Sequence, residues 1–170
     1  KSVQRYGFSN YAFDILKTKN TINSIVMNSY FNNNISIVII TFNEENQIQG
    51  LLKDLDFADE IIVVDSFSTD KTEAICRSFA KVKFHQNTFK NYPKQRNFAI
   101  SLAKNDWILF LDADERLTPQ LKLELLETVK KESHTIAFMF RRTFMFNNKA
   151  LHFSGCQNEK VFRLFNKNHA

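Results

Sequence analysis

Between residues 35 and 131, short runs of β-branched and aliphatic residues alternate with segments of helical apolar spacing. The run Ile35–Thr41 (ISIVIIT) is apolar apart from Ser36 and the final threonine, which is typical of a strand buried on both faces of a sheet. Because strands that alternate with helices form parallel sheets with crossover helices, the sequence predicts an α/β fold. Further strands are expected at residues 60–65, 82–85 and 107–111, and helices at residues 44–55, 70–81, 93–103 and 118–131.

The segment after residue 132 has a different pattern. Ile136, Phe138 and Phe140 recur at every second position, and the alternation continues to Phe146, which predicts a strand. Another short strand is expected at residues 161–165. Residues 1–34 are Asn-rich and are expected to form an N-terminal arm or extension. We therefore expect an arm (1–34), an α/β region (35–132) and an incomplete β-rich region of the same domain (133–170).

Composition excludes several classes of protein. The chain has 3 glycines in 170 residues, where average usage would give roughly 12, and it contains no Gly-rich phosphate-binding fingerprint. Its two cysteines form no C-x-x-C pair, which argues against zinc ribbons and disulfide scaffolds and favours a reducing compartment. Apolar runs such as Ile37–Ile40 are far too short to span a bilayer. A cytoplasmic protein is therefore expected.

The net charge of +5 is unevenly distributed along the chain. Residues 1–34 carry +3, residues 35–140 carry −3 and residues 141–170 carry +5. A basic end without a basic stripe along one element does not favour a nucleic-acid partner. Its cations could contact an anionic substrate or the inner face of a membrane, or simply be a solvated basic end. They are Arg141, Arg142, Lys149, Lys160, Arg163 and Lys167.

Polar and acidic side chains follow three of the expected strands. The strands end in Thr41-Phe42-Asn43-Glu44, in Asp65–Asp70 and in Asp112-Ala113-Asp114-Glu115. In open α/β sheets, ligands bind beyond the carboxyl ends of the strands. Carboxylates gathered at one edge repel each other unless a cation or a hydrogen-bonding ligand is present. A divalent metal together with a nucleotide would meet both requirements.

Individual residues at this edge have competing interpretations. Asp112 and Asp114 are two residues apart, so in an extended chain both could face one Mg²⁺ or Mn²⁺; the alternative is a solvated turn. Asp65 follows an apolar run and needs hydrogen-bond donors, either from a ligand or from a turn over residues 66–68. Lys94 and Arg96 lie in the first turn of a helix, where acids are usual, so they lie near an anion or an acidic edge, or else form an exposed surface.

Four ordered motifs resemble the family 2 glycosyltransferases: ISIVIITFNEE (35–45), IIVVDSFSTD (61–70), PKQRN (93–97) and WILFLDADERL (107–117). Within that family the chain is most similar to the bacterial lipopolysaccharide-core β-1,4-glucosyltransferases. The resemblance covers residues 35–132 well and 133–166 loosely. It implies a nucleotide-sugar-binding fold of the GT-A type and an inverting transfer from a UDP-sugar to a cell-surface glycan or glycolipid, with Mn²⁺ or Mg²⁺.

The resemblance also implies roles for individual residues. The uridine pocket would be lined by Thr41, Asn43, Glu44 and Asp65. Lys94 and Arg96 would contact the base or the phosphates, Asp112 would lie near the ribose and the metal, and Asp114 would bind the metal that bridges the diphosphate.

Inversion needs a general base for the acceptor hydroxyl. The subfamily has an Asp four residues before Arg-Leu-Phe, and this chain has Glu159 at that distance before Arg163. Glu159 is therefore the candidate base, or else a surface charge paired with Lys160 or Arg163. The chain departs from the subfamily at Phe146-Asn147-Asn148 and Gly155-Cys156, where a Phe-x-Gly and a Gly-Trp pair are usual.

Two other functions remain open at this stage. A sugar nucleotidyltransferase also uses carboxylates at strand ends, but it needs a Gly-rich loop that residues 42–45 lack. A truncated or degenerate domain would bind a nucleotide sugar without transferring it.

Overall fold

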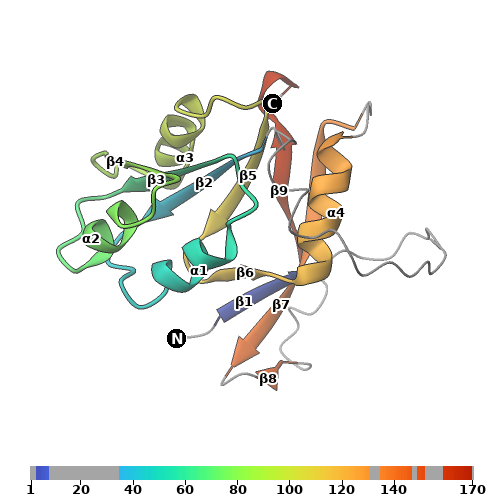
Figure 1. Cartoon of the computed structure of the whole chain (residues 1–170), viewed down its shortest axis with the longest axis horizontal. Coiled ribbons are helices and arrows are strands. Elements are labelled where there is room, and N and C mark those ends of the chain that lie inside the picture. The colour runs from blue at the N-terminus through green and yellow to red at the C-terminus, as the bar shows by residue number, and fades with distance from the viewer. Residues whose placement is uncertain (1–2, 8–34, 131–134, 147–148, 152–158, 170) are drawn as a thin grey trace.

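The computed structural model describes residues 3–7, 35–130, 135–146, 149–151 and 159–169. These residues form one mixed β-sheet with strand order β4-β3-β2-β5-β9-β7-β1-β6, and β8 pairs with β7 at the side (Figure 1). The expected α/β fold with additional β structure toward the C-terminus is confirmed. The expected features at residues 147–148 and 155–156 lie outside the described residues.

Four adjacent parallel strands make up what we call the parallel half of the sheet. They are β2 (Ile35–Thr41), β3 (Glu60–Asp65), β4 (Val82–Gln86) and β5 (Trp107–Asp112). Their register brings Thr41 level with Asp65, and Ile40 level with Asp112. The three acidic or polar strand ends predicted from the sequence therefore lie at the same edge.

Helices cover both faces of the parallel half, as its continuous apolar strands require. On one face, Ile37 and Ile39 of β2 pack in a core with residues of α1 (Ile48–Asp54), α2 (Thr72–Arg77) and α4 (Pro119–Lys130). On the other face, Val38 packs with Ala99 of α3 (Tyr92–Ser101) (Figure 1). No described helix is long and apolar enough to cross a membrane.

The remaining strands form what we call the mixed half. Strand β9 (Lys160–Asn166) runs antiparallel to β5, and β7 (Ala137–Phe146) runs antiparallel to β9. The short strand β8 (Lys149–Ala150) pairs with the end of β7, antiparallel to it. Strand β1 (Val3–Gly7) lies between β7 and β6 (Glu115–Leu117). Five residues of the expected N-terminal arm are thus part of the sheet.

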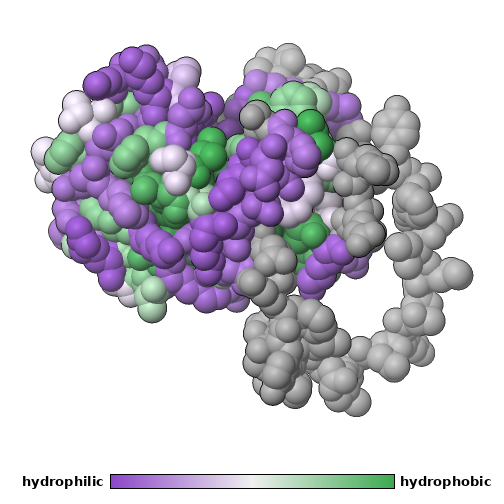
Figure 2. Space-filling model, turned by 90° about the horizontal axis from the view of Figure 1, so that it is seen from above, coloured by the Kyte–Doolittle hydropathy of each residue, from purple (hydrophilic) through white to green (hydrophobic). Residues whose placement is uncertain are grey.

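Helices α1 and α2 are shorter than expected. Glu44 does not begin α1, but its carbonyl oxygen accepts the backbone N–H groups of Gln47 and Ile48 in a preceding turn, at 2.9 Å each. Helix α3 begins as predicted around Pro93, because the side chain of Asn91 accepts the N–H of Lys94 at 2.9 Å and so caps the helix. Seen from above, the described surface is mainly hydrophilic, with smaller hydrophobic areas between (Figure 2).

Candidate functional site

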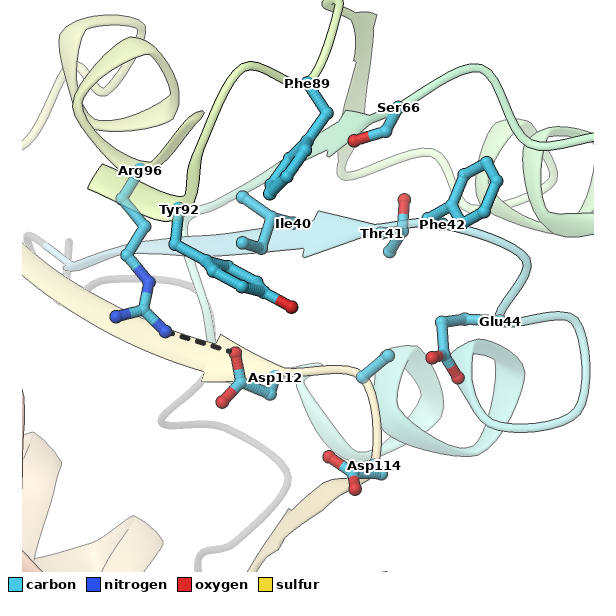
Figure 3. A pocket seen from close by; sticks show the side chains of 11 residues that line it. Ile40, Thr41, Phe42, Glu44, Ser66, Phe89, Tyr92, Arg96, Asp112 and Asp114 are labelled. Atoms are coloured by element: carbon cyan, nitrogen blue, oxygen red, sulfur yellow. Dashed lines mark ion pairs between the residues drawn. The ribbon is translucent and has the colours of Figure 1, made fainter. Parts of the chain in front are cut away.

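A pocket of about 850 Å³ opens at the carboxyl ends of β2, β3 and β5. Figure 3 shows Phe89 and Tyr92 on one side of the pocket and Glu44 and Asp114 on the other. Of the residues predicted from the sequence, the pocket lining includes Thr41, Glu44, Arg96, Asp112 and Asp114. The rest of the lining consists of Ile40, Phe42, Ser66, Phe89, Tyr92 and Ala113.

The loops after β2 and β3 hold each other in place. The N–H of Asn43 donates to the Ser68 hydroxyl at 2.8 Å, and the Asn43 side-chain oxygen accepts the N–H of Thr69 at 2.8 Å. The N–H of Glu44 donates to the Thr72 hydroxyl at 2.8 Å. Asn43, predicted to line the uridine pocket, therefore joins the two loops and is absent from the pocket lining.

Asp65 is fully buried beneath this pair of loops. One carboxylate oxygen accepts the Thr41 hydroxyl at 3.0 Å and the Ser68 hydroxyl at 2.5 Å, and the other accepts the Ser68 N–H at 2.7 Å. These bonds correspond to the turn interpretation of Asp65. Because the residue has no exposed surface, a ligand cannot contact it in this conformation.

Two residues of these loops have left-handed backbone conformations. Asn43 has φ 54° and Phe67 has φ 60°. Asparagine tolerates this region well, whereas phenylalanine does so at a cost of roughly 1–2 kcal/mol. The strained Phe67 side chain is 53% exposed, so burial of the ring does not offset the cost of the turn. The loop bonds around Ser68 hold the backbone in this form.

The start of α3 and the loop before it supply the cationic and aromatic side of the pocket. The Arg96 guanidinium lies 3.7 Å from an Asp112 oxygen (Figure 3). It also lies 4.5 Å from the centre of the Phe110 ring. The rings of Phe89 and Tyr92 meet edge to face, 5.2 Å between centres. Lys94 is exposed and is not part of the pocket lining, so the two predicted cations of this helix turn have different surroundings.

Asp112 ends β5 and is held by two arginines. Arg163 from β9 donates to one Asp112 oxygen at 2.7 Å and to an oxygen of the fully buried Glu115 at 2.5 Å. The second Glu115 oxygen accepts the N–H of Asp112 at 3.1 Å. Burial raises the pKa of Glu115, although Arg163 opposes this effect.

Asp114 differs from Asp112 in its partners. It forms no ion pair with any residue that the structure describes, and its pKa is raised by burial and by the neighbouring charge of Asp112. Arg116 supports the turn from beneath by donating to the carbonyl oxygens of Ala113 (2.9 Å) and Gln47 (2.8 Å). The turn thus presents one poorly compensated carboxylate to the pocket.

The carboxylates of this pocket are too few to hold a metal ion by themselves, so a bound molecule would have to share the metal. Within the described part of the chain, no group of three His, Cys, Asp or Glu side chains could hold a metal ion. Mg²⁺ commonly binds one or two carboxylates together with substrate phosphates, and Asp114 with its neighbour Asp112 provides that number. The number of carboxylates therefore suits a metal that a bound ligand would share and does not suit an all-protein cage.

The basic C-terminal segment is not a single cationic surface. Arg163 is buried against Asp112 and Glu115, and Arg142 forms an ion pair with Glu159. Lys167 donates to the carbonyl oxygen of Ala103 at 2.6 Å, while Lys149 and Lys160 are exposed. Glu159 is 41% exposed at the start of β9 and is not among the residues that line the pocket. The ion-pair partner of Glu159 is thus Arg142 and not Lys160 or Arg163, which the sequence suggested.

Sequence reasoning missed several residues of the site. Phe89 and Tyr92 precede the recognised PKQRN motif in a segment without periodicity, and only their aromatic character in a strand-to-helix loop could have indicated them. Arg163 belongs to the basic end of the sequence, and its bond to Asp112 spans 51 residues of sequence. No local pattern predicts such a contact.

Comparison with known proteins assigns the family. The model of glycosyl transferase family 2 matches residues 36–168, which is most of the chain. The chain belongs to this family. An uncharacterized glycosyltransferase of Rickettsia bellii is 35% identical over 147 residues, covering 85% of this chain and 50% of the relative. The lipopolysaccharide core biosynthesis glycosyltransferase LpsC of Rhizobium meliloti is 30% identical over 112 residues, covering 64% of this chain and 42% of LpsC.

Structural comparison confirms the GT-A fold that the motifs imply. The mannosyltransferase PcManGT of Pyrobaculum calidifontis, solved with GDP-Man and Mn²⁺, matches with a TM-score of 0.52 at 22% identity, covering 61% of this chain and 34% of PcManGT. The chain spans about half the length of the curated relatives it matches first. Family membership favours a glycosyltransferase over the nucleotidyltransferase alternative.

Proposed function

We propose that this family 2 chain binds a UDP-sugar and a divalent metal in the pocket and transfers the sugar, with inversion, to a bacterial cell-surface glycan or glycolipid. One observation carries the proposal: three carboxylates, an arginine and three aromatic rings surround one pocket of about 850 Å³ at the ends of β2 and β5 and around the start of α3. A nucleoside diphosphate offers the matching groups, namely a planar base, a polar ribose and a charged diphosphate.

Each pocket residue would bind the part of the UDP-sugar that suits its side chain. Arg96 can pair with phosphate oxygens or with the base, because its guanidinium faces the pocket beside Asp112. Thr41 and Glu44 also line the pocket, and Asp112 would accept a bond from a ribose hydroxyl. Asn43 and Asp65 act in the proposal by holding the loops, and Lys94 would reach the phosphates only from the rim.

Asp114, with Asp112 beside it, would hold the Mn²⁺ or Mg²⁺. When bound, such an ion neutralises the charge of the departing diphosphate. The raised pKa of Asp114 supports this role, because a bound cation would relieve the unfavourable charge that burial and Asp112 impose on it.

Glu159 would accept the proton of the acceptor hydroxyl as that oxygen attacks the anomeric carbon. Its position supports this role, because β9 is antiparallel to β5 and therefore begins at the edge where β5 ends. Arg142 orients the carboxylate through their ion pair. The exposed Lys149 and Lys160 would meet an anionic acceptor or membrane surface beside it.

Calorimetric titration with UDP, with and without Mn²⁺, tests donor binding. We expect UDP to bind more tightly in Mn²⁺, and GDP to bind at least tenfold more weakly than UDP. Equal binding of GDP would overturn the choice of base, and no binding of either nucleotide would overturn the function. A screen of UDP-sugars for slow metal-dependent hydrolysis then identifies the sugar.

A second candidate function is nucleotide-sugar binding without transfer. It is favoured by the placement of Glu159, which is engaged by Arg142 and lies outside the pocket lining. Tight UDP binding without hydrolysis or transfer of any UDP-sugar would select this alternative.

A further inference from the structure

Arg163 is a buried cation between two carboxylates of the adjacent turn. Only 5% of the residue is exposed, and one terminal nitrogen lies 2.7 Å from Asp112 and 2.5 Å from Glu115. Glu115 in turn accepts the N–H of Asp112, so the three residues form a closed hydrogen-bonded ring. The centre of the Phe110 ring lies 5.7 Å from the guanidinium. The ring of bonds fixes both the backbone and the side chain of Asp112.

A β-bulge places Arg163 at this position. Phe138 of β7 pairs with Leu164, whereas the next residue, Met139, pairs with Phe162, so Arg163 is the extra residue of β9. The pairing between β9 and β5 covers Leu164 to Asn166, so Arg163 is the first residue of β9 beyond it. Bulges occur next to active sites, where they redirect a side chain. Here the Arg163 side chain reaches from β9 to Asp112 of β5, where these two strands are no longer paired.

Two physical facts indicate that this arrangement serves the turn. The two N–H donors of a guanidinium nitrogen lie in one rigid plane, so a single terminal nitrogen can hold two carboxylates in fixed directions, whereas an ammonium group rotates on a flexible stem. A buried ion pair is a weak source of stability, because desolvation cancels most of its attraction. Its clearest benefit is the defined position of the groups that it joins.

We propose that Arg163 is a positioning residue that holds Asp112 and the Asp112–Asp114 turn in the geometry for binding the diphosphate and metal, through the ring with Glu115. Strand β9 follows Glu159 directly, so the strand next to the candidate base is tied to the donor pocket. The inference rests on the proposed function and adds a residue outside the pocket lining to it.

The test compares Arg163→Met/Glu115→Gln with the wild-type chain. The double variant removes the cation and the buried anion together, so it avoids an unpaired charge that would unfold the chain. The amide oxygen introduced by Glu115→Gln can still accept the N–H of Asp112. A matched control is Lys83→Met/Glu60→Gln, because Lys83 contacts the buried Glu60 at 2.5 Å in the same sheet, and neither residue lines the pocket.

We expect UDP affinity in Mn²⁺ to fall at least tenfold in the Arg163 double variant and to stay within twofold of wild type in the control. Arg163→Lys should give an intermediate affinity, since it keeps the positive charge but not the rigid planar donors of the guanidinium. An affinity within twofold of wild type for the Arg163 double variant would overturn the proposal.

A measurement without ligand keeps this proposal separate from the proposed function. If the wild-type chain binds no UDP, the function fails, and amide hydrogen exchange of residues 112–117 decides the role of Arg163. Faster exchange there in the Arg163 double variant, with unchanged exchange in β3, supports positioning of the turn. Unchanged exchange in residues 112–117 overturns it.

Discussion

The two halves of the sheet present their functional groups in different ways. In the parallel half, each strand leads into a loop whose polar residues follow the strand directly, as at Thr41, Asp65 and Asp112. In the mixed half, Glu159 directly precedes β9 and Arg163 lies within it. The neighbours of β9 in the sheet are β5 and β7, which come from other parts of the chain. Strand β1 comes from a more distant segment still, and it joins β7 to β6.

The difference shows how a site can depend on both local and long-range order. The loops of the parallel half are cross-linked by their own side chains, such as Asn43 with Thr69. The Asp112–Asp114 turn is held by Arg163 from the mixed half and by Arg116. Variants in the two halves should therefore separate donor binding, transfer and stability.

The largest effect is expected in the mixed half. Glu159→Gln should lower the rate of transfer by about 10²–10⁴-fold, because the acceptor hydroxyl loses its base. UDP affinity should stay unchanged, since Glu159 does not line the donor pocket. Steady-state transfer assays and UDP titration measure the two quantities. Near-normal transfer by this variant would move the base to another carboxylate.

In the parallel half, Asp65→Ala should lower the free energy of unfolding by about 2–3 kcal/mol, because Thr41 and Ser68 lose a buried charged acceptor. UDP affinity should fall equally with and without metal, since the variant disturbs the loops and not the metal site. Urea denaturation measures the stability, with Asp54→Ala as the control at a 44% exposed aspartate. A loss of affinity only in Mn²⁺ would contradict this role.

Asp114→Asn tests the metal site at the junction of the halves. A neutral amide is a poor ligand for a hard cation, so most of the Mn²⁺-dependent gain in UDP affinity should disappear, about tenfold or roughly 1.4 kcal/mol. Metal-free UDP affinity should not fall. Asp56→Asn is the matched control, because Asp54 and Asp56 have the same spacing at the end of α1. Equal affinity of Asp114→Asn and wild type in Mn²⁺ would remove Asp114 as a ligand.

A smaller effect is expected at the strained turn of the parallel half. Phe67→Gly should change the free energy of unfolding by less than about 1 kcal/mol, because relief of the φ 60° strain offsets the greater freedom of the unfolded chain. Phe67→Val should lower stability by roughly 1–2 kcal/mol, since a β-branched residue fits this region badly. Denaturation curves of both variants give the comparison, and greater stability of the valine variant would contradict it.

The smallest effects concern pH, and their signs should differ between the halves. Burial opposes ionisation of Glu60, but hydrogen bonds from Lys83, Ser36 and Lys104 prevail and lower its pKa below 4.5. Glu60 therefore stabilises the fold above pH 4.5, and this contribution is lost as the pH falls through the lowered pKa. The pKa of Glu115 is raised above 4.5, so stability falls as the pH rises through that raised value.

Glu60→Gln should accordingly make the fold lose less stability as the pH falls. Glu115→Gln should make the fold lose less stability as the pH rises. Thermal unfolding between about pH 3 and pH 7 measures both profiles. The same direction of change in both variants would contradict the contrast between the two carboxylates.

Sequence reasoning predicted the parallel half closely and the mixed half in outline. Runs such as Ile35–Thr41 have a composition that only a strand buried on both faces accommodates, and the strand β2 has the predicted bounds. The predicted strands around Phe138 and Val161 also formed, as β7 and β9. Strand β1 was not predicted, because Val3–Gly7 has no alternating pattern and pairs only with partners supplied by the fold.

The chain's own local patterns determined the α/β order, the polar ends of three strands and the family. These features depend on residues that are near each other in sequence, where periodicity and motif spacing are informative. Tertiary structure alone decided that Asp65 is buried under Ser68, that Asp112 is held by Arg163, and that Glu159 pairs with Arg142. Ion pairs and hydrogen bonds form between whichever groups packing brings within about 3 Å, and strand register, including one bulge in β9, sets those distances.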